Sequence, residues 1–410
     1  MIARKRTVWI SLALVLGLLL SLAPVSLAGS SEGGPARSFT DPMLQIGRSM
    51  AAQQQGEAAA QRSPDSSPQM TIIATGLNNP RGMAFAPNGD LYVAEAGVGG
   101  PDCYEVDPGQ PPLCIGNTGS VTRIRQGVQE RVATGLVSLG DPSGFGSVGP
   151  TSLSFTPRGN ATVLVGLGAD PAFRDQLASD YNLMFANLGH SVRMSPSGYW
   201  NTEVDVSAYE GSNNPDGGEV DSNPYGVLFD RNKNFIADAG GNDLVQIDSN
   251  GNLSTVAVFP DQLVPVPPFL GGGMIPMQAV PTAVVKGPDG ALYVSTLTGF
   301  PFPAGGAKVY RVIPGSNPAV YADGFTALVD LTFDSSGNMY VVEFAQDLLA
   351  CESQGICQGR VIRVAPDGTR TVLASNLNAP GGVAVSRNGE VYATTFSIFP
   401  GGGQVVRLVP

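Results

Sequence analysis

The sequence predicts an all-β protein: a six-bladed β-propeller with four antiparallel strands per blade, its ring closed by an N-terminal strand that completes the last blade. Three observations predict this fold. One strand–turn–strand pattern recurs six times, most copies are followed by a second hairpin, and a lone strand precedes the first copy. The composition agrees, because 42% hydrophobic and 14% charged residues suit a large core and exclude long charged helices.

The repeated unit is clearest in its first copy. Residues 79–85 read as a strand, Asn88 and Gly89 as a tight turn, and residues 91–95 as the returning strand. Equivalent strands begin near positions 80, 150, 224, 281, 329 and 380, at a mean spacing of about 60 residues. The last copy ends after its third strand, so residues 70–74 are expected to supply the fourth and remove an exposed edge.

Residues 1–28 have the layout of a secretory signal peptide. Basic residues precede the apolar run of residues 8–22, and Ala28 ends a group of small residues suited to cleavage. An uncleaved anchor remains the alternative. Residues 29–68 read as a disordered Ser/Gly/Ala/Gln/Pro-rich linker, and residues 69–410 as the propeller domain. We therefore expect a protein that is secreted or held in the periplasm or cell envelope, with no stable membrane span after cleavage.

Four cysteines fit an oxidising compartment. Cys103 and Cys114 bracket one loop, Cys351 and Cys357 another, and two local disulfides are the simplest of the three possible pairings. The formal charge of −11 disfavours nucleic acid as a partner. With His190 as the single histidine, a zinc site built from several histidines is excluded, and we expect this residue to serve a turn or the surface.

Two repeats carry insertions. After the second copy, residues 170–180 and 207–213 have helical character, with candidate strands at 191–194 and 199–204 between them. After the third copy, residues 260–276 form a loop rich in Pro, Gly and Val. Long loops on a propeller decorate one face, which is where ligands bind.

Four segments together resemble the ScyD/ScyE family of exported NHL-like bacterial propellers, named for members encoded beside genes for the pigment scytonemin. They are residues 79–82, 209–226, 237–243 and 297–303, and the resemblance covers the chain from about residue 71 to its C-terminus. It implies the fold and export. It implies neither pigment synthesis nor any catalytic residue, and the metal-dependent lactonases among six-bladed propellers are a weaker analogy.

The mouth of the central channel is where chemistry is expected. Residues that follow the second strand of each blade converge there, and Glu95, Asp238 and Glu343 bring carboxylates from alternate blades. With Asn223 they form a candidate site for Ca²⁺ or Mg²⁺, which prefer oxygen ligands. The alternative is structural: such residues cap turns by accepting backbone N–H bonds, or pair with a basic neighbour such as Arg81.

Other residues are candidates for a ligand-binding face: Asn79, Arg81, Tyr225, Asp330, Phe300 and Phe302. The two phenylalanines could equally pack within their own loop. Asp216, Asp221 and Asn223 lie in an oxygen-rich loop that suits calcium or a plain turn cluster, without EF-hand spacing.

Two functions follow, and the sequence leaves open whether the protein is an enzyme. The first is a ligand-binding or accessory protein whose propeller face takes a small molecule, glycan or protein. The alternative is a lactonase-like hydrolase that uses a divalent metal held by the carboxylates at the mouth.

Overall fold

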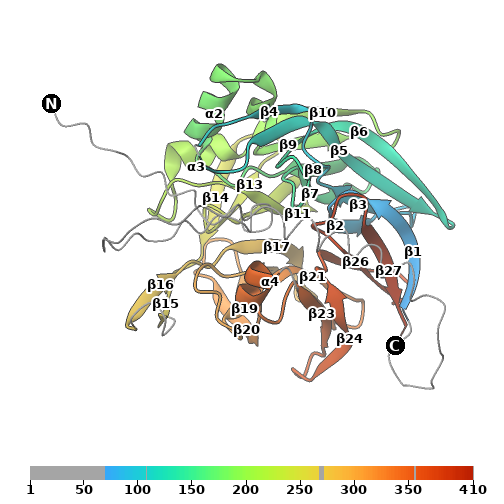
Figure 1. Cartoon of the computed structure of the whole chain (residues 1–410). Helices are drawn as coiled ribbons and strands as arrows, with labels where there is room; N and C mark the ends of the chain where they lie inside the picture. The colour runs from blue at the N-terminus through green and yellow to red at the C-terminus, as the bar shows by residue number, and fades with distance from the viewer. Residues whose placement is uncertain (1–69, 108, 267–271, 355–356, 410) are drawn as a thin grey trace. The chain divides into compact units, whose positions relative to one another are not determined.

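The computed structural model describes residues 70–409 apart from 108, 267–271 and 355–356. The predicted signal peptide and linker therefore lie outside the described residues. Within them, six antiparallel sheets are arranged around a central axis, as the sequence predicts (Figure 1). No helix in the described part of the chain has the length and apolar character needed to cross a membrane.

The blades are numbered in chain order, each from its innermost strand outward. Blade 1 contains β2 (Pro80–Phe85), β3 (Leu91–Glu95), β5 (Leu113–Arg125) and β6 (Val128–Gly140), with β4 (Asp102–Tyr104) also paired to β5. Blade 2 contains β7 (Pro150–Phe155), β8 (Ala161–Val165), β9 (His190–Met194) and β10 (Trp200–Asp205). Blade 3 contains β11 (Pro224–Asp230), β12 (Lys233–Asp238), β13 (Asp243–Ile247) and β14 (Leu253–Val258).

The second half of the ring repeats this order. Blade 4 contains β17 (Pro281–Lys286), β18 (Leu292–Thr296), β19 (Ala307–Val312) and β20 (Ala319–Phe325). Blade 5 contains β21 (Leu328–Phe333), β22 (Met339–Glu343), β23 (Gln358–Val364) and β24 (Arg370–Asn378). Blade 6 contains β25 (Gly382–Val385), β26 (Val391–Thr395), β27 (Gly403–Leu408) and β1 (Met70–Leu77).

The two ends of the described chain meet in blade 6, which confirms the predicted closure. Strand β1 pairs antiparallel with β27, and Met70 lies opposite Leu408. Leu77 at the end of β1 is fully buried. Strand β1 also contacts blade 1, because Gln129 exchanges two hydrogen bonds with the backbone of Thr75. The N-terminal strand thus joins the last blade to the first.

Both predicted disulfides are present. Cys103 in β4 is bonded to Cys114 in β5, where the two residues are register partners. Cys351 is bonded to Cys357 and lies in the short helix α4 (Leu348–Gln354), between the second and third strands of blade 5. Disulfides of this kind are typical of proteins that fold in an oxidising, exported environment.

The insertion in blade 2 folds largely as predicted. Helix α2 (Pro171–Asp180) begins after Asp170, whose side chain accepts a hydrogen bond from the Ala172 N–H, and a 3₁₀ turn, η3 (Leu183–Asn187), follows. Helix α3 (Ser207–Asn213) follows β10. The Pro/Gly/Val loop differs from the expectation of an irregular loop, because it contains the paired strands β15 (Gln262–Pro265) and β16 (Met274–Met277).

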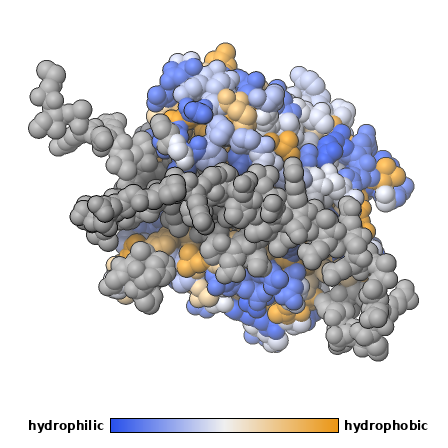
Figure 2. All heavy atoms as spheres, viewed as in Figure 1, coloured by the Kyte–Doolittle hydropathy of each residue, from blue (hydrophilic) through white to orange (hydrophobic). Residues whose placement is uncertain are grey.

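Apolar side chains pack between neighbouring blades, and glycine allows the innermost strands to approach closely. A Cβ atom on Gly226 in blade 3 would lie 2.6 Å from the Thr282 carbonyl oxygen of blade 4, closer than real Cβ contacts. On the face visible in Figure 2, hydrophobic residues are scattered among hydrophilic ones. Scattered exposed apolar residues are ordinary for a folded domain.

Candidate functional site

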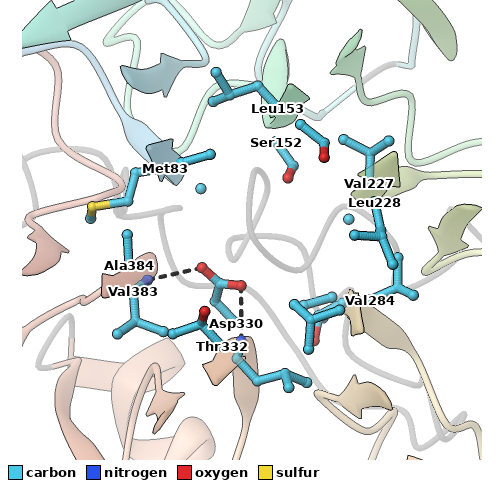
Figure 3. Close-up of a pocket in the computed structure, with 18 of the residues that line it drawn as sticks. Met83, Ser152, Leu153, Val227, Leu228, Val284, Asp330, Thr332, Val383 and Ala384 are labelled. Carbon is cyan, nitrogen blue, oxygen red and sulfur yellow. Dashed lines mark hydrogen bonds between the residues drawn. The ribbon is translucent and has the colours of Figure 1, made fainter. Parts of the chain in front are cut away.

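The central channel contains a cavity of about 270 Å³. Its walls are formed by the innermost strands of all six blades, with side chains pointing inward (Figure 3). The lining is mixed: Met83, Leu153, Val227 and Val284 contribute apolar surface, and polar residues such as Ser152, Asp330 and Thr332 help to give a similar extent of polar surface. A concave space whose apolar walls carry polar groups is the usual form of a small-molecule site.

The position after the proline at the start of each innermost strand forms a ring at the channel. Its members are Arg81, Thr151, Tyr225, Thr282, Asp330 and Gly381, with Val329 replacing the proline in blade 5. The two threonines tie adjacent blades together. Thr151 Oγ1 donates to the Pro224 carbonyl oxygen at 3.1 Å, and Thr282 Oγ1 to that of Leu328 at 2.9 Å. The polar ring members that remain are Arg81, which donates to the Ser147 carbonyl oxygen, and Tyr225 and Asp330, which line the cavity.

Tyr225 is the central member of this polar group. Its side chain is 5% exposed, and its hydroxyl oxygen is buried without a hydrogen-bond partner. Burial raises the pKa of the phenol, the nearby Arg81 opposes that rise, and Asp330 adds to it. Two other ligand-face candidates, Arg81 and Asp330, thus lie within electrostatic reach of this phenol. A buried hydroxyl without a hydrogen bond lowers the stability of the fold. A ligand or water that forms a hydrogen bond with it would offset this loss.

Arg81 is 3% exposed and donates from Nη2 to the Ser147 carbonyl oxygen at 2.9 Å. Burial lowers the pKa of this guanidinium, although Tyr225 acts in the opposite direction. Asp330 faces the channel and accepts hydrogen bonds from the Leu331 N–H at 2.8 Å and the Val383 N–H at 2.9 Å (Figure 3). Burial raises the pKa of Asp330 to about 7, and these two bonds limit the rise. This carboxyl can therefore change charge near neutral pH.

The raised pKa of Asp330 predicts a pH-dependent stability. Because the folded-state pKa is about 7 against an ordinary value of 3.8, the contribution to stability is complete below about pH 4 and is lost as pH rises through 7. The loss is at most about 4 kcal/mol, and less to the extent that channel water solvates the carboxylate. We expect the wild-type free energy of unfolding to fall relative to that of Asp330→Asn between pH 4 and 8. Parallel urea-unfolding curves for the two proteins across this range would contradict the prediction.

Two of the predicted metal-ligand carboxylates are paired with arginines of their own blades. Glu95 is fully buried, and its carboxylate accepts two hydrogen bonds from Arg131, at 2.7 and 3.0 Å. Glu343 is equally buried, forms an ion pair with Arg360 and accepts the Thr326 N–H at 3.0 Å. Each carboxylate therefore already has a cationic partner, which is the structural alternative that the sequence left open.

The third carboxylate, Asp238, holds a turn. Its two oxygens accept hydrogen bonds from the Ser222 hydroxyl and from the backbone N–H groups of Asn223, Gly240 and Gly241. Asn223 Oδ1 accepts the Leu167 N–H at 3.2 Å. In the described part of the chain, no three His, Cys, Asp or Glu side chains form a group that could hold a metal ion. The set Glu95, Asp238, Glu343 and Asn223 stays a prediction, and this geometry does not favour it.

Three other ligand-face candidates serve the fold. Asn79 is fully buried and bonds through Nδ2 to the carbonyl oxygens of Gly97 and Gly144. Phe302 is 6% exposed within the largest apolar cluster, and Phe300 packs edge-on against it with ring centroids 6.0 Å apart. The two phenylalanines pack against each other, as one of the two alternatives expects, and their part in an apolar face for a flat ligand stays a prediction. His190 is also local, with Nδ1 3.0 Å from the Leu188 carbonyl oxygen.

A buried acidic cluster lies beside blade 3, and sequence reasoning found only part of it. We define the acidic cluster as Glu210, Asp216, Asp221, Asp238 and Asp243. Glu210 comes from α3, and Asp238 and Asp243 are register partners on β12 and β13. Burial and the neighbouring carboxylates raise the pKa values of Glu210 and Asp221 to about 8, and that of Asp243 well above its ordinary value. The sequence signal for this cluster was the pair Asp238 and Asp243, which lie on either side of the Gly240-Gly241 turn.

No family model matches the chain, and no curated protein matches it. Among solved structures it is similar to a streptogramin B lyase, with 12% identity over 83% of this chain and 97% of that chain and a TM-score of 0.45. A gluconolactonase from Xanthomonas campestris aligns with 10% identity over 84% and 90% of the two chains, at a TM-score of 0.48.

The calcium-binding protein regucalcin from Agrobacterium tumefaciens aligns with 10% identity over 83% of this chain and 94% of that chain, at a TM-score of 0.47. At these levels of identity and structural similarity the comparisons carry no argument about activity, because one propeller architecture hosts many unrelated functions.

Proposed function

We propose that this protein is an exported, ligand-binding β-propeller of the ScyD/ScyE type that takes a small molecule into its central channel. The observation that carries the proposal is the cavity of about 270 Å³, one of whose lining residues, Tyr225, has a buried hydroxyl without a hydrogen-bond partner. The family assignment is supported by the sequence resemblance alone. The channel, rather than the mouth or the aromatic loop, offers both apolar area and unused polar atoms.

The lining indicates the chemistry of the ligand. The wall combines aliphatic side chains with polar ones such as Ser152 and Thr332, so a ligand needs both apolar surface and hydrogen-bonding groups to replace the bonds it loses to water. Tyr225 and Asp330 offer one phenol and one carboxyl that titrates near neutral pH. A compact molecule with an apolar body and several hydroxyl, amide or carbonyl groups matches this set, and the volume admits about a dozen to twenty heavy atoms.

Binding is tested with a panel of small aromatic alcohols, amides, lactones and monosaccharides, detected by ligand-observed NMR on the full chain. We expect the aromatic alcohols and amides to bind, and Tyr225→Phe to weaken their binding about tenfold, because the hydrogen bond to the Tyr225 hydroxyl is lost. Tyr340→Phe is the matched control, since the Tyr340 hydroxyl donates to Asp334 away from the channel lining. Equal affinities in wild type and Tyr225→Phe would overturn the placement of the ligand.

The same panel separates the proposal from the hydrolase alternative. A ligand-binding protein leaves the lactones and esters unchanged during incubation with or without Ca²⁺ or Mg²⁺. Metal-dependent turnover that Asp238→Asn abolishes would favour the hydrolase instead, in which a metal activates a bound water. The carboxylate pairing described above favours the binding function, because two of the predicted metal ligands, Glu95 and Glu343, already form ion pairs with arginines.

A further inference from the structure

The acidic cluster contains carboxylate oxygens that the fold buries and leaves without partners. Asp243 is 1% exposed, and neither of its carboxylate oxygens has a hydrogen-bond partner. Glu210, at 3% exposed, has an unpartnered Oε1, and Asp221, at 5%, an unpartnered Oδ1. Buried polar atoms in folded proteins nearly always have partners, so four unpaired carboxylate oxygens in one cluster need a physical explanation.

The fold brings these groups together through a close approach. Helix α3 places Glu210 over the turn between β12 and β13, where a Cβ atom on Gly241 would lie 3.0 Å from Glu210 Oε2 and 3.6 Å from Asp238 Cγ. A larger residue at this turn would require the Glu210 carboxylate to shift by a few tenths of an ångström. Asp238 and Asp243 face each other across the same two strands. The acidic cluster thus combines residues from the insertion in blade 2 and from the turn in blade 3.

No basic side chain neutralises the cluster. None of the ion pairs among the described residues includes one of its five members. This contrasts with Glu95 and Glu343, which are equally buried but paired with arginine. Burying carboxylates without a counter-charge or hydrogen bonds is costly, and a bound cation is the group that would supply both the charge and the missing contacts.

We propose that the acidic cluster binds a divalent cation, Ca²⁺ in the first place, between the carboxylates of Glu210 and Asp243. Asp216 is the partly exposed member of the cluster, and its carboxylate accepts a hydrogen bond from the Asn242 side chain at 3.0 Å. The described residues contain no ready-made group of three acidic, His or Cys ligands, so backbone carbonyls and water would complete the shell. Ca²⁺ tolerates such a mixed set of six to eight oxygens, whereas Mg²⁺ demands strict octahedral geometry.

The proposal is independent of the channel ligand and differs from the predicted metal set at the channel mouth. It assigns no ligand role to Glu95 or Glu343. Asp238 lies beside the site, but its oxygens already accept four hydrogen bonds, so its part is to fix the turn. The exposed carboxylates Glu219 and Asp261 add negative charge near the cluster, which would raise the local concentration of cations.

The experiment is thermal unfolding of the full chain after chelation, with Ca²⁺, Mg²⁺ or Mn²⁺ added back, together with equilibrium dialysis against radioactive Ca²⁺. We expect Ca²⁺ at about 100 times its dissociation constant to raise the wild-type midpoint by roughly 5 °C, with about one ion bound per chain. A larger rise with Mg²⁺ or Mn²⁺ than with Ca²⁺ would overturn the choice of Ca²⁺.

Two variants and one control locate the ion. Asp243→Asn and Glu210→Gln should each weaken Ca²⁺ binding at least tenfold and should not lower the midpoint of the Ca²⁺-free protein, because the unpartnered carboxylate oxygens have no protein hydrogen bond to lose. A merely structural carboxylate would lower it. Asp248→Asn, in an exposed turn, should keep the full Ca²⁺ response. The absence of Ca²⁺ binding to the wild type, or unchanged Ca²⁺ binding to both variants, would overturn the site. A failure to find a small-molecule ligand for the central channel would not affect this test.

Discussion

A chain that begins at Asn78, and so lacks β1, should lose most of its stability and associate with itself. The missing strand buries Leu77 and Ala74 and supplies the outer partner of β27. Burial of one leucine contributes about 1.5–3 kcal/mol, and several backbone hydrogen bonds contribute about 1 kcal/mol each. We expect a loss on the order of 5 kcal/mol or more, and an exposed edge on β27 that pairs with other molecules.

The matched control begins eight residues earlier, at Met70, and keeps β1. The two chains are compared by urea unfolding and size-exclusion chromatography. A peptide of residues 70–77 added in trans should restore part of the lost stability, because it can occupy the vacant edge of blade 6. Equal unfolding midpoints for the two chains would show that the ring does not depend on this closure.

The substitution Arg131→Met should lower the free energy of unfolding by about 3 kcal/mol, because it leaves the buried Glu95 carboxylate without its cation. The estimate is at the lower end for a broken buried pair, since the arginine side chain is 39% exposed. The double variant Arg131→Met/Glu95→Gln should recover part of the loss by removing the orphaned charge. Chemical denaturation of the four proteins of this cycle measures the coupling.

Arg123→Met is the control for this substitution. Arg123 also lies in blade 1, but its partner Glu130 is 59% exposed, so the loss should stay below about 1 kcal/mol. Equal losses for Arg123→Met and Arg131→Met would contradict the idea that burial of the acidic partner decides the effect. Glu95→Gln should also leave any response to Ca²⁺ unchanged, which separates the ion pair from the predicted metal role.

The blades could be predicted because each repeat contains the same local sequence pattern of two strands joined by a tight turn. Asn88-Gly89 and its counterparts form tight turns between alternating apolar strands, and the count of copies equals the count of blades. The sequence also named Arg81, Tyr225 and Asp330 as ligand-face candidates, and in the structure Arg81 and Asp330 both interact electrostatically with Tyr225. Hairpin β15–β16 escaped prediction, because prolines in both strands argue against strand formation although each can lie on a sheet edge.

The partners of the predicted carboxylates could not be found in the same way. Arg131 and Arg360 lie on outer strands, where the repeat pattern is weak and side-chain direction depends on register shifts between β5 and β6 or β23 and β24. The acidic cluster was harder still, because Glu210 belongs to an insertion that no other repeat contains. Its position depends on how α3 packs over the β12–β13 turn, which is a tertiary contact with no local signature.

Because β1 closes the ring, it also determines when blade 6 can fold. Strand β1 lies at the start of the described chain and pairs with β27 at its end, so blade 6 cannot form until almost all of the sequence has been synthesised. Pairings this distant in sequence form slowly. For a chain exported as residues 1–28 predict, the ring stays unsealed while the polypeptide is threaded across the membrane. The final strand pairing and the two disulfides would then be made in the same compartment, after translocation has ended.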